Sequence, residues 1–248
     1  MRQDPLQVLQ GAMRPSPTVG MPRLVIAGAT GVLGNEVLRR LVGGGTFSLA
    51  QVLAREPITA GLRGVQAAVV PAAEPGEWPL VQADVAVVMF DPPRLFYDRE
   101  RALWTPLPGQ LPALAQWLRS SGVRTLAVVL PHAPGRLPEA LKRGLASLDE
   151  HAVARLGFER LLILRSAQKP VAATQAGALA RLARWMLSTV HYMVPSSEQP
   201  VRAAKVAELL AIALRTAPPG IHVAAPEVMW EAAQGQAPAV AARWLGSA

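Results

Sequence analysis

The chain has 248 residues, of which 51% are hydrophobic and 17% are charged. This balance excludes a disordered chain and suits one large α/β domain with an aliphatic core. The chain holds no cysteine, which excludes disulfides, thiolate metal sites and a cysteine nucleophile.

The formal net charge is +8, which favours anionic partners. The arginines are spread along the chain, so the charge gives little support to nucleic acid as a partner. The four histidines show no metal-ligand spacing, and we expect no metal site. No run of about 18 apolar residues occurs, and we expect no membrane span and a cytoplasmic protein.

Residues 1–20 carry several prolines and glycines and predict a flexible N-terminal extension. From residue 21 onward, aliphatic runs alternate with helical patterns. The runs predict strands at 23–27, 49–54, 65–70, 84–90, 125–130 and 161–165. Helical spacing predicts helices at 35–41, 111–121 and 137–156. This alternation indicates a single α/β domain over 21–248, with a doubly wound parallel sheet of the Rossmann type.

The pattern changes beyond Ser166. It predicts helices at 178–187, 201–216 and 228–234 and a short strand at 220–224. We expect these elements to form a small C-terminal lobe, about residues 167–248, over the strand ends on the substrate side.

A glycine-rich segment, Gly28-Ala-Thr-Gly31-Val-Leu-Gly34, follows the first predicted strand and opens the first helix. In a dinucleotide loop the first glycine permits a tight turn, and the second lets the backbone approach the pyrophosphate. The third lets the helix pack close to the strand. The phosphates then face the first N–H groups and the positive end of the helix dipole. The spacing predicts a nicotinamide dinucleotide bound by Gly28, Thr30, Gly31, Val32, Leu33 and Gly34.

This segment resembles the start of atypical and extended short-chain dehydrogenase/reductases. The resemblance continues at 84–88 and 121–129, and residues 156–166 are similar to a strand of NmrA-like members. It covers roughly residues 22–235 and implies an NAD(P)-binding Rossmann fold.

The resemblance places the adenine ribose near the end of the second strand, where Arg55 stands. An arginine there can pair with a 2′-phosphate, whereas an acidic residue binds a free 2′-hydroxyl. Glu56 is adjacent, so NAD(H) stays open while Arg55 favours NADP(H). Ligands of an open parallel sheet lie at the carboxyl ends of its strands. We therefore add four residues to the expected cofactor site: Phe90, Asp91, Pro92 and Leu130.

The resemblance also implies a catalytic tyrosine, a lysine four residues later, and a serine at the end of the fifth strand. Counted back from Leu156-Gly157-Phe158, these positions fall near Lys142, Ala146 and Leu130. No tyrosine lies within 137–156 in any register. The Tyr-Lys dehydrogenase chemistry of the family is therefore expected to be missing.

Other side chains could replace the missing acid. His132 follows the fifth strand, and an imidazole there could donate a proton near neutral pH, although a surface-loop histidine is the simpler interpretation. Lys142 could bind phosphate and Tyr97 could reach the cleft. The simpler alternatives are an exposed helix lysine and a tyrosine packed under its loop. His151 is expected on a helix surface.

Two functions remain. The first is a non-catalytic NAD(P)(H)-binding protein, a pseudoenzyme. It would act as a nucleotide-dependent sensor or as a structural or assembly partner, either with another protein or within a homo-oligomer. The second is an NADPH-dependent reductase or isomerase that uses His132 as its acid. The glycine loop predicts micromolar or tighter dinucleotide binding in either case.

Overall fold

The computed structural model describes residues 20–58, 64–71, 74–94, 97–132, 141, 144–167 and 201–246. Residues 1–19 of the predicted extension, the predicted helix at 178–187 and Lys142 lie outside the described residues.

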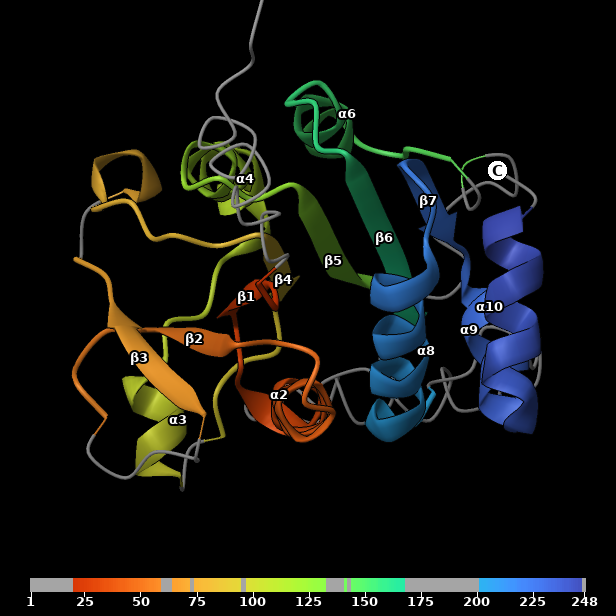
Figure 1. Cartoon of the computed structure of the whole chain (residues 1–248), viewed down its shortest axis with the longest axis horizontal. Coiled ribbons are helices and arrows are strands. Elements are labelled where there is room, and N and C mark those ends of the chain that lie inside the picture. Colours follow the sequence, from red (N-terminus) through yellow and green to blue (C-terminus); the bar gives the residue numbers. More distant parts are fainter. Residues whose placement is uncertain are drawn as a thin grey trace, which may run out of the picture.

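Seven parallel strands form one sheet in the order β3-β2-β1-β4-β5-β6-β7 (Figure 1). They are β1 (Arg23–Ala27), β2 (Leu49–Ala54), β3 (Val65–Val69), β4 (Val85–Met89), β5 (Thr125–His132), β6 (Arg160–Ala167) and β7 (Gly220–Ala224). The strand order reverses between β1 and β4, and open parallel sheets bind their ligands at the carboxyl ends of the strands at such a reversal. The predicted doubly wound Rossmann sheet is confirmed.

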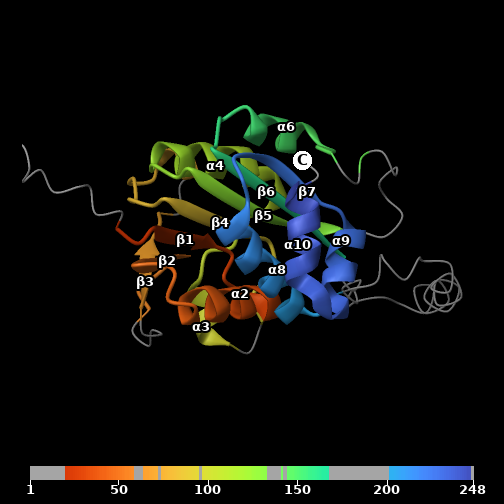
Figure 2. The same cartoon turned by 45° about the vertical axis from the view of Figure 1, so that its right-hand side comes forward.

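Helices cover both faces of the sheet (Figures 1 and 2). On one face lie α2 (Gly31–Gly43) and α8 (Ala203–Thr216), with α10 (Ala237–Gly246) beside α8. On the other lie α4 (Leu111–Ser120) and α6 (Leu148–Ala154). Every residue of β4 is buried, as expected for a central parallel strand that is covered on both faces. Two further short α-helices are α3 (Asp98–Ala102) and α9 (Pro226–Glu231).

The fifth strand is longer than predicted. Pro131 was expected to end it, but β5 continues to His132 and pairs with β6 throughout. The pairing with β4 stops at Val129, so Pro131 has a neighbouring strand on one side only. Proline is tolerated at such a position because few ladder bonds depend on its missing N–H.

The predicted helix at 137–156 is wrong over 144–147, which is not helical, and α6 begins only at Leu148. Ser147 caps α6, because its hydroxyl accepts a bond from the Glu150 N–H at 3.1 Å. The Glu150 carboxylate accepts one from the Ala146 N–H at 2.7 Å. A serine three residues before a glutamate is the signature of a capping box, which starts a new helix at this point.

The described C-terminal residues do not stand apart from the sheet. β7 extends the sheet beside β6, and α8 packs against α2. The unpredicted helix α10 is fixed by Trp244, whose indole N–H donates to the Val223 carbonyl at 3.0 Å. Apolar side chains of α8 and α10 join the core under the sheet, so their burial holds residues 201–246 against it. The remainder of the expected lobe, residues 168–200, is outside the described ranges.

Candidate functional site

The first and third glycines of the loop have the geometry that the motif predicts. Gly28 has φ +73°, and a Cβ atom there would collide with the carbonyl oxygen of Met89 on β4. A Cβ atom on Gly34 would lie 2.5 Å from the carbonyl carbon of Ala29. Only glycine fits either position, so the loop turns tightly from β1 into α2 and the helix packs close to the strand.

The second glycine faces protein atoms. Gly31 has φ +68°, and a Cβ atom there would lie 3.0 Å from the Asp91 Cβ atom. The Gly31 N–H donates to an oxygen of Glu100 at 3.0 Å. A carboxylate therefore occupies the position at the amino end of α2 where a dinucleotide loop presents its N–H groups to phosphate.

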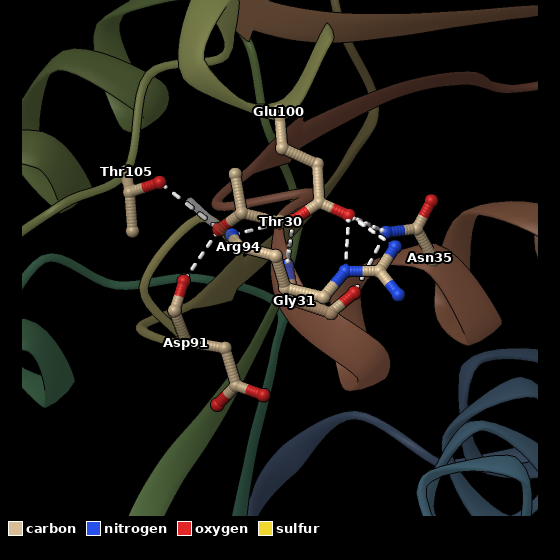
Figure 3. A network of polar contacts seen from close by, with 7 residues as sticks. All are labelled: Thr30, Gly31, Asn35, Asp91, Arg94, Glu100 and Thr105. Carbon is tan, nitrogen blue, oxygen red and sulfur yellow. Dashed lines mark hydrogen bonds and ion pairs between the residues drawn. The ribbon is translucent and has the colours of Figure 1, made fainter. Parts of the chain in front are cut away.

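Glu100 is held by a network of donors (Figure 3). The Asn35 amide donates to it at 2.7 Å, while Arg94 donates from its backbone N–H at 2.9 Å and from Nε at 2.8 Å. Arg94 also donates from Nη2, and its guanidinium lies 4.0 Å from the centre of the Tyr97 ring. Because these donors come from α2 and from the segment after β4, Glu100 joins the two.

The ionisation of Glu100 reflects this surrounding. Glu100 is 2% exposed. Burial opposes its charged form, but the hydrogen bonds from Arg94, Gly31 and Asn35 outweigh burial and lower the pKa of Glu100 from 4.5 to about 2. The carboxylate is therefore charged at any physiological pH, and its negative charge faces the positive end of the α2 dipole.

Two further contacts hold the segment after β4 against the loop. The Thr30 hydroxyl donates to the Asp91 carbonyl and lies 3.0 Å from the Thr105 hydroxyl. The backbone of 102–104 runs antiparallel to the end of β2, where the Trp104 N–H donates to the Leu53 carbonyl at 2.9 Å. The Trp104 carbonyl accepts a bond from the Gly28 N–H, after β1, at 3.1 Å. This stretch thus crosses the carboxyl ends of β1 and β2.

Trp104 anchors that stretch in the core. Its side chain is 9% exposed and meets Trp78 edge-on, with ring centroids 4.8 Å apart. Trp78 also contacts Trp117 of α4. Trp104 therefore belongs to the core and fixes the place where the segment after β4 returns to the sheet.

The other expected cofactor residues lie around the same strand ends. Val32 is exposed in the first turn of α2, and Leu33 is buried below it. Arg55 is exposed immediately after β2, with its backbone N–H bonded to the Ala102 carbonyl at 2.7 Å. Phe90 and Leu130 pack partly against the core on the α4 side. Asp91 is partly buried and Pro92 exposed, beside Gly31.

The residues present do not fit a pyrophosphate in this conformation. The Gly31 N–H is already bonded to an anion, and the Asp91 carboxylate is also close to Gly31. Two carboxylates would repel phosphate oxygens at this distance. The loop has the backbone of an anion site, and the protein supplies the anion itself.

A second group of expected site residues meets at the carboxyl ends of β5 and β6. Leu130 and Ala146, the positions of the family's serine and lysine, line one pocket of about 320 Å³ together with Pro131, Glu150 and Arg165. Arg165 and Glu150 form a buried ion pair at 2.7 Å, which ties α6 to β6. The structure thus brings together two of the three positions that the family resemblance assigns to catalysis.

Three other candidates are placed as follows. His132 is the last residue of β5. Tyr97 is exposed and contacts Arg94, and His151 is exposed on α6 as expected. Across the described ranges, no cluster of three or more His, Asp or Glu side chains could hold a metal ion. No helix in the same ranges is long and apolar enough to span a bilayer.

No sequence motif marks Glu100, Arg94 or Asn35. The stretch Asp98-Arg-Glu-Arg101 has the mixed charges of an exposed helix, so the burial of Glu100 is not visible in it. Asn35, one residue after the last motif glycine, offers a weak local signal, since an asparagine inside a helix often bonds to a backbone carbonyl four residues earlier, as it does here to Gly31 at 2.7 Å.

No family model and no curated protein matches the chain. Among solved structures, it is similar to the triphenylmethane reductase of Citrobacter sp. complexed with NADP(H), at 14% identity over 82% of this chain and 70% of that chain, with a TM-score of 0.49. It is also similar to UDP-N-acetylglucosamine 4-epimerase from Bacillus cereus, at 13% identity over 82% and 79%, with a TM-score of 0.44.

A third similar structure is the Bordetella bronchiseptica enzyme WbmG in complex with NAD, at 12% identity over 93% of this chain and 90% of that chain, with a TM-score of 0.44. Two of these three neighbours hold a nicotinamide dinucleotide, and the third is named as an epimerase. Likeness at this level concerns architecture alone, and the function of this chain has to be argued from its own residues.

Replacement of Glu100 by glutamine tests the network. The charged form is favoured in the folded state, so its contribution is present above pH 4.5 and lost as the pH falls towards 2. At pH 7 we expect Glu100→Gln to lower the free energy of unfolding by about 1.5–3 kcal/mol, the range for hydrogen bonds to a charged group. This deficit should shrink in denaturant titrations as the pH is lowered below 4.5.

The exposed Glu77, in the turn before β4, offers a matched control as Glu77→Gln. It should change stability little at any pH. Equal stability of the Glu100 variant and the wild type at pH 7 would show that the network contributes nothing.

Proposed function

We propose that this chain is a non-catalytic Rossmann protein that takes up NADP(H) when the dinucleotide displaces the Glu100 carboxylate from the amino end of α2. The bond from the Gly31 N–H to Glu100 carries the proposal. It shows that the amino end of α2 accepts an anion, within a loop whose outer glycines keep the dinucleotide geometry.

The competition has an energetic consequence. A ligand that binds only the open state has its apparent affinity reduced by the fraction of molecules that are open. If the contacts of Glu100 favour the closed state by about 1.5–3 kcal/mol, apparent binding is weakened about ten- to hundredfold. The micromolar affinity expected from the glycine loop would then describe the open state.

Opening would supply the signal of a sensor. The described residues 91–94 and 97–101 are held to α2 through Glu100, Arg94 and Asn35, and a dinucleotide would release them while Trp104 stays anchored. A partner that recognises the released segment, or a second copy of the chain, would then respond to the nucleotide. Such coupling requires only that the two states differ in their affinity for the nucleotide.

The absence of Tyr-Lys chemistry is part of the proposal. Proton delivery to a developing alkoxide contributes roughly 10²–10⁴ in rate. Leu130 and Ala146, which line the pocket at the ends of β5 and β6, can neither donate a proton nor lower the pKa of a neighbouring acid.

The competition predicts that Glu100→Ala and Glu100→Gln bind NADPH about ten- to hundredfold more tightly than the wild type, because the closed state loses its anion. Calorimetry measures the affinities, with Glu77→Gln as the control that leaves binding unchanged. Gly31→Asp should abolish binding in every background. If neither Glu100 variant binds NAD(H) or NADP(H) up to millimolar concentration, dinucleotide binding is wrong for this chain.

The choice between cofactors depends on Arg55, which is exposed at the end of β2. A guanidinium contact to the 2′-phosphate should favour NADPH over NADH by about ten- to hundredfold. In the Glu100→Gln background, Arg55→Ala should remove most of this preference, whereas Arg39→Ala on the exposed surface of α2 should retain it. Tighter binding of NADH than of NADPH would make Glu56 the better candidate.

Activity measurements separate the two functional classes. With NADPH and a panel of aldehydes, ketones and quinones, we expect little turnover by the wild type or by Glu100→Gln, because the positioned acid is missing. Bound NADPH should instead raise the melting temperature of Glu100→Gln. Robust turnover that is lost in His132→Ala would establish a reductase with an unusual acid. Robust turnover that survives this change would place the active site elsewhere.

A further inference from the structure

A second pocket lies at the opposite edge of the sheet from the glycine loop. It has a volume of about 290 Å³ and is lined by the amino ends of β4, β5 and β6 and the last turns of α2 and α8. The glycine loop follows the carboxyl end of β1, so this pocket is separate from the candidate dinucleotide site.

The lining is strongly basic. Among the described lining residues, Asp84 is the one acidic residue. Four lining residues are arginines: Arg40, Arg124, Arg160 and Arg215. Two of them have weak partners at exposed positions. Arg124 lies 3.5 Å from Asp84 and Arg40 lies 3.8 Å from Glu208, and such surface pairs contribute little. Asp84 already accepts a bond from the Arg23 N–H at 2.9 Å.

The strand register places two polar residues side by side on the inner wall. Leu24, Val85, Thr125 and Arg160 stand next to one another across β1, β4, β5 and β6. Leu24 and Val85 belong to the apolar core beneath α2 and α8. Residues in register on parallel strands point to the same face, so Thr125 and Arg160 face the two helices as well.

These two side chains have hydrogen-bonding capacity that the described protein leaves unused. Thr125 is 1% exposed, and its hydroxyl has no hydrogen-bond partner. The Nε atom of Arg160 is also buried without a partner. Buried polar atoms are nearly always bonded, so we expect a bound water or a group of a ligand to complete these two.

The helix dipoles explain only part of the charge. Arg40 and Arg215 lie in the last turns of α2 and α8, where a cation compensates the negative end of the dipole. Arg160 and Thr125 stand on strands, so this account does not apply to them. A valine at 125 would pack against the core without an unsatisfied hydroxyl, so stability alone does not favour threonine there.

We propose that this pocket binds a small phosphorylated anion. Arg124 and Arg160 would hold the phosphoryl group in bidentate contacts, and the Thr125 hydroxyl would donate to it, while Arg40 and Arg215 would stand at the rim. Guanidinium groups match phosphate oxygens in charge and planar geometry. The volume is at the low end for ligand pockets and suits a phosphate monoester of a few carbons better than a dinucleotide.

The test uses inorganic phosphate, pyrophosphate and glucose 6-phosphate as probes, with affinity measured by calorimetry and by the rise in melting temperature. We expect the wild type to bind a phosphorylated probe more weakly as salt is added. Arg160→Gln should weaken binding at least tenfold, and Arg39→Gln, which removes an exposed arginine of α2 outside the pocket, should not.

Thr125→Val separates binding from folding. It should weaken the probe several-fold without lowering the melting temperature of the free protein, because it removes an unbonded buried hydroxyl. Arg160→Gln and Thr125→Val should leave the NADPH affinity of Glu100→Gln unchanged. The phosphate pocket and the dinucleotide site are therefore tested independently of one another. No binding of any probe by the wild type at millimolar concentration would overturn the proposal, as would equal losses in Arg160→Gln and Arg39→Gln. A preference for citrate or an acidic peptide over every phosphorylated probe would also reject it.

Discussion

The bond between the Gly31 N–H and the Glu100 carboxylate determines how the functional edge of this sheet is organised. The first N–H groups of a helix have no partners within the helix and need an acceptor from elsewhere. Thr30 occupies the N-cap position, yet its hydroxyl does not cap α2 and is directed to Asp91 and Thr105 instead. Glu100 therefore supplies the missing acceptor, and the segment after β4 must lie over the loop to deliver it.

Because Glu100 occupies the amino end of α2, the contact between Glu100 and the loop and the binding of a phosphate there exclude one another. In an open dinucleotide loop the N–H groups await phosphate, and the strand ends beside them are free. Here the stretch 102–104 crosses the ends of β1 and β2, and Trp104 fixes it from the core side. The low pKa of Glu100 means that protonation does not release the carboxylate at neutral pH. On the proposed function, release of the segment would require a competing anion or a partner that binds the segment.

The sequence reveals the parts of the fold that depend on local pattern. Aliphatic runs predict the seven strands of the described sheet, and the spacing of Gly28, Gly31 and Gly34 predicts the loop, because the motif lies within seven consecutive residues. The steric reason for glycine is local only at Gly34, since Gly28 and Gly31 face atoms of Met89 and Asp91. The start of α6 was also encoded locally, in the Ser147–Glu150 capping box, but helical periodicity concealed it. Glu100 could not be predicted, since its burial depends on a partner 69 residues away in the chain.

Charged side chains complement helix dipoles at both the carboxyl and the amino ends of the strands, but the two ends differ in how fully the donors are used. Carboxylates stand at the amino end of α2, and arginines stand at the last turns of α2 and α8, so each complements the helix dipole that it faces. At the carboxyl ends, the donors around Glu100 are satisfied, because Gly31, Asn35 and Arg94 all donate to its carboxylate. At the amino ends of the strands, Arg160 and Thr125 add donors beyond what the dipoles require, and both residues line a pocket. At the carboxyl ends of the strands, Glu100 already bonds to the donors, so a dinucleotide would have to displace it. At the amino ends, an anion would bond to donors that the described protein leaves unused.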